Sequence, residues 1–263
     1  MNKDLLMSYD QYSKIKHETP YFYISRSKDR LIYYFGSNHS HNPNHSQFNL
    51  LKKKWSNFLS DTKDMKTAVI VEAYEISKQE TTLEEFIIKY GESGAGAYFA
   101  YESKSLLIFG EPQNNKIIDY LLRNFSKEEV LFWYECQAIK FWQRHKRGRN
   151  IQEFLSNHTE KYRKLLEWPD LIVSVEFISS IYRKLFNQEL NINDEKIFSQ
   201  ITSPISIKSR INELSRSQSV YRNEYMLEQT EKYWKEGYNI FIVHGAGHAV
   251  MQEPVIRGLI GDV

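Results

Sequence analysis

Four short apolar segments punctuate the chain and predict buried β-strands. They are rich in β-branched and aromatic residues, and polar residues or glycines bound each of them, which is typical of strands covered on both faces. The segments lie at residues 30–36, 67–73, 105–110 and 239–244. Strands of this kind occur mainly in parallel sheets, because parallel sheets carry helices on both faces.

Helical periodicity fills the intervals between these segments. Apolar residues recur every three to four positions, which predicts amphipathic helices. The expected helices cover residues 46–61, 83–90, 94–102, 114–124 and 219–235. Because strands and helices alternate, we expect an α/β fold with a largely parallel sheet flanked by helices.

The pattern changes between residues 126 and 218, where long helical stretches follow one another. Helices are expected at residues 126–146, 150–168 and 169–185, and a polar loop at residues 187–207. Ser126 with Glu129 forms a capping-box pattern, and Gly148 stands where a helix should end. We expect one α/β domain over residues 1–263, with residues 126–218 as a helical insertion that caps it.

Composition narrows the class of protein. Apolar residues make up 41% and aromatic residues 14% of the 263 positions, which excludes disorder as the main state. The 35 basic and 33 acidic side chains nearly balance, so we expect no nucleic-acid partner. The single cysteine, Cys136, excludes an internal disulfide and a thiolate metal cluster. No apolar run reaches the ~20 residues of a membrane span, and a cytoplasmic location is expected.

Glycine is scarce, with only 11 residues, yet it marks two matching motifs. Gly36 to His39 and Gly245 to His248 both read G-x-x-H, and each follows a predicted strand. Loops after parallel strands open on the same edge of a sheet, so the two histidines are expected to converge. Two imidazoles at such an edge predict a site for a divalent metal ion of the zinc, manganese or cobalt type.

Carboxylates occupy matching places. Glu72 and Glu111 follow the second and third strands, and Glu92 lies in the glycine-rich segment 91–94. Among these alternatives, Glu111 is predicted as a metal ligand beside His39 and His248. Glu72 and Glu92 are predicted catalytic groups, because a metal lowers the pKa of its water and a carboxylate acts as general base. The competing interpretation makes each of these side chains a surface or capping residue.

The chain resembles the TraB/PrgY and TIKI proteins, within the superfamily that includes the erythromycin esterases and ChaN-like proteins. The resemblance rests on FGSNHSHNP, on GESGAGAYFAYESKSLLIFGEP, on the Arg222-Asn223 pair and on VHGAGHAVMQEP. It covers residue 31 to about residue 112 and residues 219–254. It implies an α/β fold and a metal-dependent hydrolytic site, with peptidase activity in the TIKI branch.

The motif-matched residues are His39, Glu92, Arg222, Asn223 and His248. The family's key glutamate matches Glu72, Glu92 or Glu111, and this choice stays open. Arg222 and Asn223 are predicted to orient the substrate or to stabilise an oxyanion. The family's membrane anchors are not found in this sequence, and residues 126–218 have no clear counterpart in the family.

Other catalytic patterns fit less well. The loop His39-Ser40-His41 begins like the metallo-β-lactamase signature H-x-H-x-D-H, but the aspartate is absent and His45 comes one position too late. The segment around Ser93 is similar to a serine nucleophile elbow, yet a helical pattern precedes it instead of a strand. The basic cluster at residues 144–149 suits a helix C-terminus better than a nucleic-acid contact.

Two classes of function remain. The first is a metal-dependent hydrolase acting on a small-molecule or peptide substrate. The second is an inactive ligand- or peptide-binding or regulatory protein on the same fold. The oligomeric state is not predicted.

Overall fold

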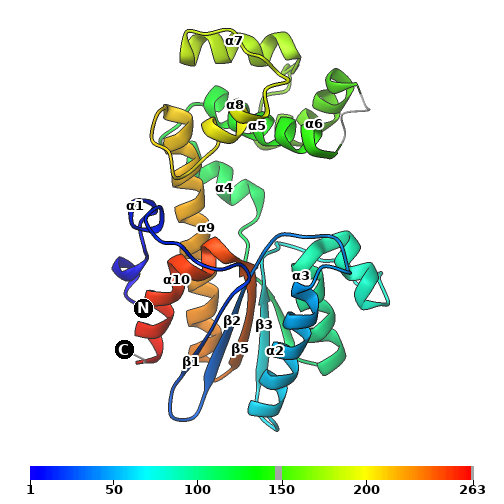
Figure 1. The fold of residues 1–263 in the computed structure, drawn as a ribbon. Helices are drawn as coiled ribbons and strands as arrows, with labels where there is room; N and C mark the ends of the chain where they lie inside the picture. Colours follow the sequence, from blue (N-terminus) through cyan, green and yellow to red (C-terminus); the bar gives the residue numbers. More distant parts are fainter. Residues whose placement is uncertain (146–149, 262–263) are drawn as a thin grey trace. The chain divides into compact units, whose positions relative to one another are not determined.

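The computed structural model describes residues 1–145 and 150–261 and has the expected α/β architecture (Figure 1). The chain divides into two compact units. The first unit combines Met1–Pro112 with Arg222–Val263, and the second is Gln113–Tyr221. The second unit is wider at both ends than the helical insertion predicted at residues 126–218.

A five-stranded sheet forms the centre of the first unit, in the order β1-β2-β5-β3-β4. The strands are β1 (Tyr21–Arg26), β2 (Leu31–Ser37), β3 (Thr67–Val71), β4 (Leu106–Phe109) and β5 (Asn239–Gly245). All neighbouring strands are parallel except β1 and β2. The four predicted strands are confirmed. The antiparallel edge strand β1 was not predicted, although its residues Tyr21 to Ile24 are aromatic or β-branched, and only two of its six residues are buried.

Helices cover both faces of this sheet (Figure 1). The helices α2 (Gln47–Asp61) and α3 (Leu83–Ser103) pack on one face. The C-terminal part of α9 (Arg210–Lys235) and α10 (Ala246–Ile260) pack on the other. Every residue of β2 and β5 is buried between these layers, which accounts for their unbroken apolar sequences.

The register of β2 and β5 determines where the two G-x-x-H motifs lie. In this parallel pair Gly36 is opposite His244, and Ser37 is opposite Gly245. Both strands therefore end at the same level, and both histidine-bearing segments leave the sheet side by side. The predicted convergence of the motifs follows from this register.

Helix α3 joins two helices that the sequence predicts separately. Gly91 has φ +63° and ψ −141° inside it, a conformation that favours glycine and breaks the helical path. The predicted glycine-rich turn is therefore a kink, and Glu92 is the first residue after it. Helix α3 begins with a capping box formed by Thr82 and Glu85.

The second unit is helical and consists of α4 (Asn114–Leu121), α5 (Lys127–His145), α6 (Ile151–Leu165), α7 (Val175–Phe186), α8 (Glu195–Ile201) and the N-terminal part of α9. The capping box of Ser126 and Glu129 is present. The predicted stop at Gly148 lies outside the described residues. Short N-terminal helices, η1 (Lys3–Leu5) and α1 (Tyr9–Tyr12), belong to the first unit.

Three expectations in this region were wrong, and in each case a capping residue sets the true boundary. Helix α7 begins at Val175 instead of residue 169, because the Ser174 hydroxyl accepts the Phe177 N–H. The expected loop at residues 187–207 contains α8, which Asp194 caps. Helix α9 begins at Arg210 instead of residue 219, and Ser209 Oγ accepts the Asn212 N–H at 3.2 Å.

Candidate functional site

All seven predicted site residues meet at the carboxyl end of the sheet in the first unit. Contacts connect them in three groups, which are His39 with Glu92, His248 with Asn223, and Arg222 with Glu72 and Glu111. Glu72 follows β3 and joins the second and third groups. The predicted placement of Glu111 after β4 is confirmed, and its partner is Arg222.

Glu92 holds His39 from the kink of α3. Its carboxylate lies directly against His39 Nδ1 and is only 6% exposed, while the His39 side chain is 68% exposed. Hydrogen bonding to Glu92 raises the pKa of His39 to about 9, although burial opposes the shift. Burial also works against charge on Glu92, but His39 lowers the pKa of this carboxyl overall. The pair fixes the ring of His39 through Nδ1 and leaves Nε2 for another partner.

Asn223 holds His248 in the same manner. His248 lies in the first turn of α10, and its Nδ1 is 2.9 Å from Asn223 Oδ1 on α9. The other ring nitrogen, Nε2, is 3.6 Å from Glu72 Oε1. His248 therefore also presents Nε2 toward the carboxyl end of the strands.

Glu72 lies between the two imidazoles. The backbone N–H of Gly245 donates to Glu72 Oε2 at 2.5 Å. A Cβ atom added at Gly245 would lie 2.9 Å from His39 Nε2 and 3.3 Å from Glu72 Oε2. His39 Nε2 and Glu72 Oε2 therefore both border the space that a side chain at residue 245 would fill. Burial disfavours the charged form of Glu72, but His248 and Arg222 hold the pKa of this carboxyl well below its usual range.

Arg222 joins two of the carboxylates. Its guanidinium donates to Glu111 at 2.8 Å and to Glu72 Oε1 at 2.8 Å. Burial opposes the charge of Arg222, but Glu111 and Glu72 together raise its pKa. Because this guanidinium already has two carboxylate partners, it positions Glu72 and Glu111 in this structure.

The donor set fits a divalent metal ion in its chemistry. Two imidazole Nε2 atoms and one carboxylate suit zinc, manganese and cobalt. No group of three His, Cys, Asp or Glu side chains within the described residues already stands ready to hold a metal. Both oxygens of Glu72 accept hydrogen bonds in this structure, from Arg222 and from the Gly245 N–H. A metal ion bound by Glu72 would have to replace one of these donors.

Sequence reasoning missed a buried group behind His248. His244 is fully buried at the end of β5, where burial lowers its pKa to about 3. Its Nδ1 is 2.9 Å from the hydroxyl of Tyr34, which donates to Gln252 at 2.8 Å. The available signal was strand alternation. His244 follows Ile240 and Ile242 at every second position of β5, so its side chain lies on the same face of the sheet, toward α10.

The competing catalytic patterns find little support. Ser93 lies in a helix, and its hydroxyl donates to the Glu72 carbonyl at 3.0 Å. Burial raises the pKa of the Cys136 thiol well above its usual range, which suits a core residue. His41 is exposed, and its Nδ1 contacts the Ile88 carbonyl oxygen. In the basic cluster at residues 144–149, four backbone positions and all side chains lie outside the described residues.

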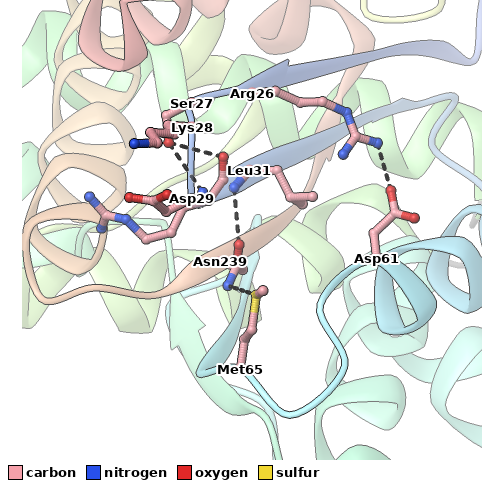
Figure 2. A pocket seen from close by; sticks show the side chains of 9 residues that line it. Arg26, Ser27, Lys28, Asp29, Leu31, Asp61, Met65 and Asn239 are labelled. Atoms are coloured by element: carbon pink, nitrogen blue, oxygen red, sulfur yellow. Dashed lines mark hydrogen bonds and ion pairs between the residues drawn. The ribbon is translucent and has the colours of Figure 1, made fainter.

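A pocket lies at the opposite end of the sheet, by the turn between β1 and β2 (Figure 2). There Arg26 pairs with Asp61 at 2.6 Å, and the Leu31 N–H donates to Asn239 Oδ1 at 3.0 Å (Figure 2). Arg30 donates to the Trp234 carbonyl oxygen. These contacts support the turn, so the carboxyl end of the sheet is the stronger candidate site.

Comparison with known proteins assigns this chain to no family. No family model matches the chain, and no curated protein or solved structure does so. No helix within the described residues is long and apolar enough to cross a membrane.

Proposed function

We propose that this protein is a metal-dependent hydrolase that cleaves an amide or ester bond at the carboxyl end of its sheet. One observation carries the proposal. His39 and His248 direct Nε2 toward Glu72, while Glu92 and Asn223 hold Nδ1 of each ring. Metal-binding histidines are usually held in this way by a carboxylate or carbonyl oxygen. The resemblance to the TraB/PrgY and TIKI proteins supports the same function.

The roles of the residues follow from their contacts. His39, His248 and Glu72 would hold the cation, and Glu92 and Asn223 would orient the two imidazoles. Glu72 and Glu92 thus take other roles than the catalytic ones expected from the sequence. A bound divalent cation supplies Lewis acidity and lowers the pKa of water. The 68% exposure of His39 leaves room for a small-molecule or peptide substrate to approach.

Arg222 and Glu111 support this site from behind. The guanidinium keeps Glu72 in place and has Glu111 as its second partner. We therefore assign Arg222 to positioning instead of oxyanion binding, and Glu111 to holding Arg222 instead of the metal. The charges agree with this assignment, because Glu72 and Glu111 face the Arg222 guanidinium and Glu92 faces His39. The resulting excess of negative charge favours a cation. The raised pKa of His39 means that a metal ion would have to displace the proton on its Nε2.

A binding or regulatory protein without turnover is the second candidate. The observation in its favour is that Arg222, the expected oxyanion partner, already donates to Glu72 and Glu111. In that case the site binds a metal ion or a small ligand, and no bond is hydrolysed there. For both candidates we propose a cytoplasmic location, which agrees with the single buried cysteine.

Metal analysis of the purified protein tests the proposal. We expect about one zinc, manganese or cobalt ion per chain in the wild type and its loss in His39→Ala and His248→Ala. His17→Ala is the matched control, because His17 contacts Tyr12 and Glu18 outside the site. Hydrolysis of ester and peptide libraries should depend on the same metal. Wild-type protein that binds no metal at micromolar concentrations contradicts the proposal, and metal binding without turnover selects the second candidate.

A further inference from the structure

A continuous chain of buried polar side chains runs from His248 into the core. Asn223 Oδ1 is 2.9 Å from His248 Nδ1 and 2.8 Å from Gln252 Nε2. Gln252 Oε1 is 2.8 Å from the Tyr34 hydroxyl, which is 2.9 Å from His244 Nδ1. Tyr34, Asn223, His244 and Gln252 have no exposed surface. Buried polar groups must each satisfy a donor or an acceptor, so the position of one proton constrains the next.

We propose that Gln252 is a positioning residue that fixes the tautomer of His248 through Asn223, with the proton on Nδ1 and the lone pair on Nε2. This inference rests on the proposed function, because the lone pair on Nε2 is what a metal ion needs. Neither Gln252 nor Asn223 touches the cation in this arrangement. The chain acts on the site by deciding which nitrogen of His248 is available.

The sulfur of Met226 determines which way the Gln252 amide points. Gln252 Nε2 lies 3.4 Å from Met226 Sδ, and Met226 is fully buried. A thioether accepts a hydrogen bond weakly and never donates one. The NH2 group of Gln252 therefore faces Met226 and Asn223, and its carbonyl oxygen faces Tyr34. With the amide reversed, two acceptors would oppose each other at Met226.

The other end of the chain agrees with this orientation. The single hydroxyl proton of Tyr34 goes to Gln252 Oε1, so the Tyr34 oxygen accepts from the Nδ1–H of His244. His244 Nε2 has no hydrogen-bond partner and then carries a lone pair. The opposite polarity would leave a buried N–H without an acceptor at this position, which proteins avoid most strictly.

The polarity of the chain reaches His248 through one oxygen. Asn223 Oδ1 accepts from Gln252 Nε2, so this oxygen also faces His248 Nδ1 and requires a proton there. Glu72 is the competing acceptor on the other side of the ring, and it lies farther from Nε2 than Asn223 Oδ1 lies from Nδ1, at 3.6 Å against 2.9 Å. The longer distance is beyond that of a hydrogen bond, and Glu72 already accepts from Arg222 at 2.8 Å. A neutral His248 therefore keeps its proton on Nδ1.

Nitrogen NMR of the metal-free protein tests the inference directly. The ¹⁵N shifts of a histidine ring distinguish a protonated from an unprotonated nitrogen, and free histidine prefers its proton on Nε2. With ¹⁵N-histidine labelling, at a pH where His248 is neutral, we expect at least a tenfold excess of the Nδ1–H tautomer at His248. A wild-type protein with its proton mainly on Nε2 overturns the inference.

Gln252→Glu is the informative variant. A carboxylate at this position only accepts, so Asn223 should turn its NH2 group toward it and toward His248 Nδ1. We expect the His248 proton to move to Nε2 and metal affinity to fall by about 10–100-fold, as for other partners that orient metal ligands. Retention of the Nδ1–H tautomer in the folded variant overturns the role of Gln252.

A second variant guards against misfolding of the first. Met226→Leu conserves volume and should fold, but it removes the acceptor that fixes the amide. We expect a measurable fraction of the Nε2–H tautomer at His248. Met251→Leu is the control, because Met251 is a buried methionine on α10 that makes no contact in this series of hydrogen bonds, and it should leave the tautomer unchanged. An unchanged tautomer in Met226→Leu overturns the role of the sulfur. Because these spectra need no metal, their outcome is separate from that of the proposed function.

Discussion

Gly245→Ala places a methyl group at the centre of the proposed site without disturbing the backbone. Gly245 has φ −62° and ψ 148°, a conformation that alanine adopts freely. The new Cβ would be 2.9 Å from His39 Nε2 and 3.3 Å from Glu72 Oε2. The first distance is too short, so the His39 ring must move away from its present position.

The expected effects on folding and on the site differ in size. The His39 side chain is 68% exposed and can swing into solvent. Its lost contact with Glu92 should cost about 1 kcal/mol after screening. Metal affinity should fall by more than the roughly 10–100-fold typical of removing a partner that only orients a ligand, because one of the two imidazoles leaves the site. The pKa of His39 should drop from about 9 toward its ordinary value of 6.5 as the contact with Glu92 breaks.

Three measurements check this prediction, and one variant controls it. Urea unfolding gives the stability, a competing chromophoric chelator gives the metal affinity, and NMR titration gives the pKa of His39. Gly247→Ala is the control, because its Cβ would meet only the Tyr12 side chain, at 3.2 Å. If Gly245→Ala keeps both the metal affinity and the His39 pKa of the wild type, the shared space between His39 and Glu72 is refuted.

Two further predictions concern the buried charges and the buried histidine. Arg222→Met removes the cation shared by Glu72 and Glu111 and should lower the free energy of urea unfolding by about 3 kcal/mol, whereas a loss below about 1 kcal/mol contradicts a supporting role. The pKa of His244 is lowered from 6.5 to about 3 in the folded state. Its neutral form therefore contributes stability that is complete above pH 6.5 and is lost as the pH falls toward 3, up to about 5 kcal/mol. Urea unfolding at several pH values should show this loss for the wild type and a flatter dependence for His244→Asn, and parallel curves would falsify it.

The parts of the fold that follow from short-range patterns were predictable. Strands β2, β3, β4 and β5 are continuous apolar runs, and helices on both faces require such runs. The edge strand β1 and helix α8 escaped prediction because their stability comes from neighbours in space. Strand β1 pairs with β2 on one side only, and α8 starts at an aspartate cap within a polar segment.

The candidate site shows the same limit at the level of single residues. The convergence of His39 and His248 followed from strand ends alone, since parallel strands bring their loops to one edge. The division of labour among the glutamates did not. It depends on the kink at Gly91, which directs Glu92 to His39, and on Arg222, which binds Glu111. Such pairings depend on side-chain distances across four elements, and no spacing in the sequence encodes them.

The glycines that open the two G-x-x-H motifs have different duties. A Cβ at Gly36 would lie 2.7 Å from Ala249 Cβ and 2.9 Å from Ala246 Cα, so this glycine lets α10 rest against β2. Gly245 instead leaves space for His39 and Glu72. A side chain at Gly36 would prevent α10 from packing on β2, and the protein would aggregate or be degraded in the cell. At the second position a side chain would yield folded protein with an impaired site. The same substitution in two identical motifs therefore causes a folding defect at Gly36 and a functional defect at Gly245.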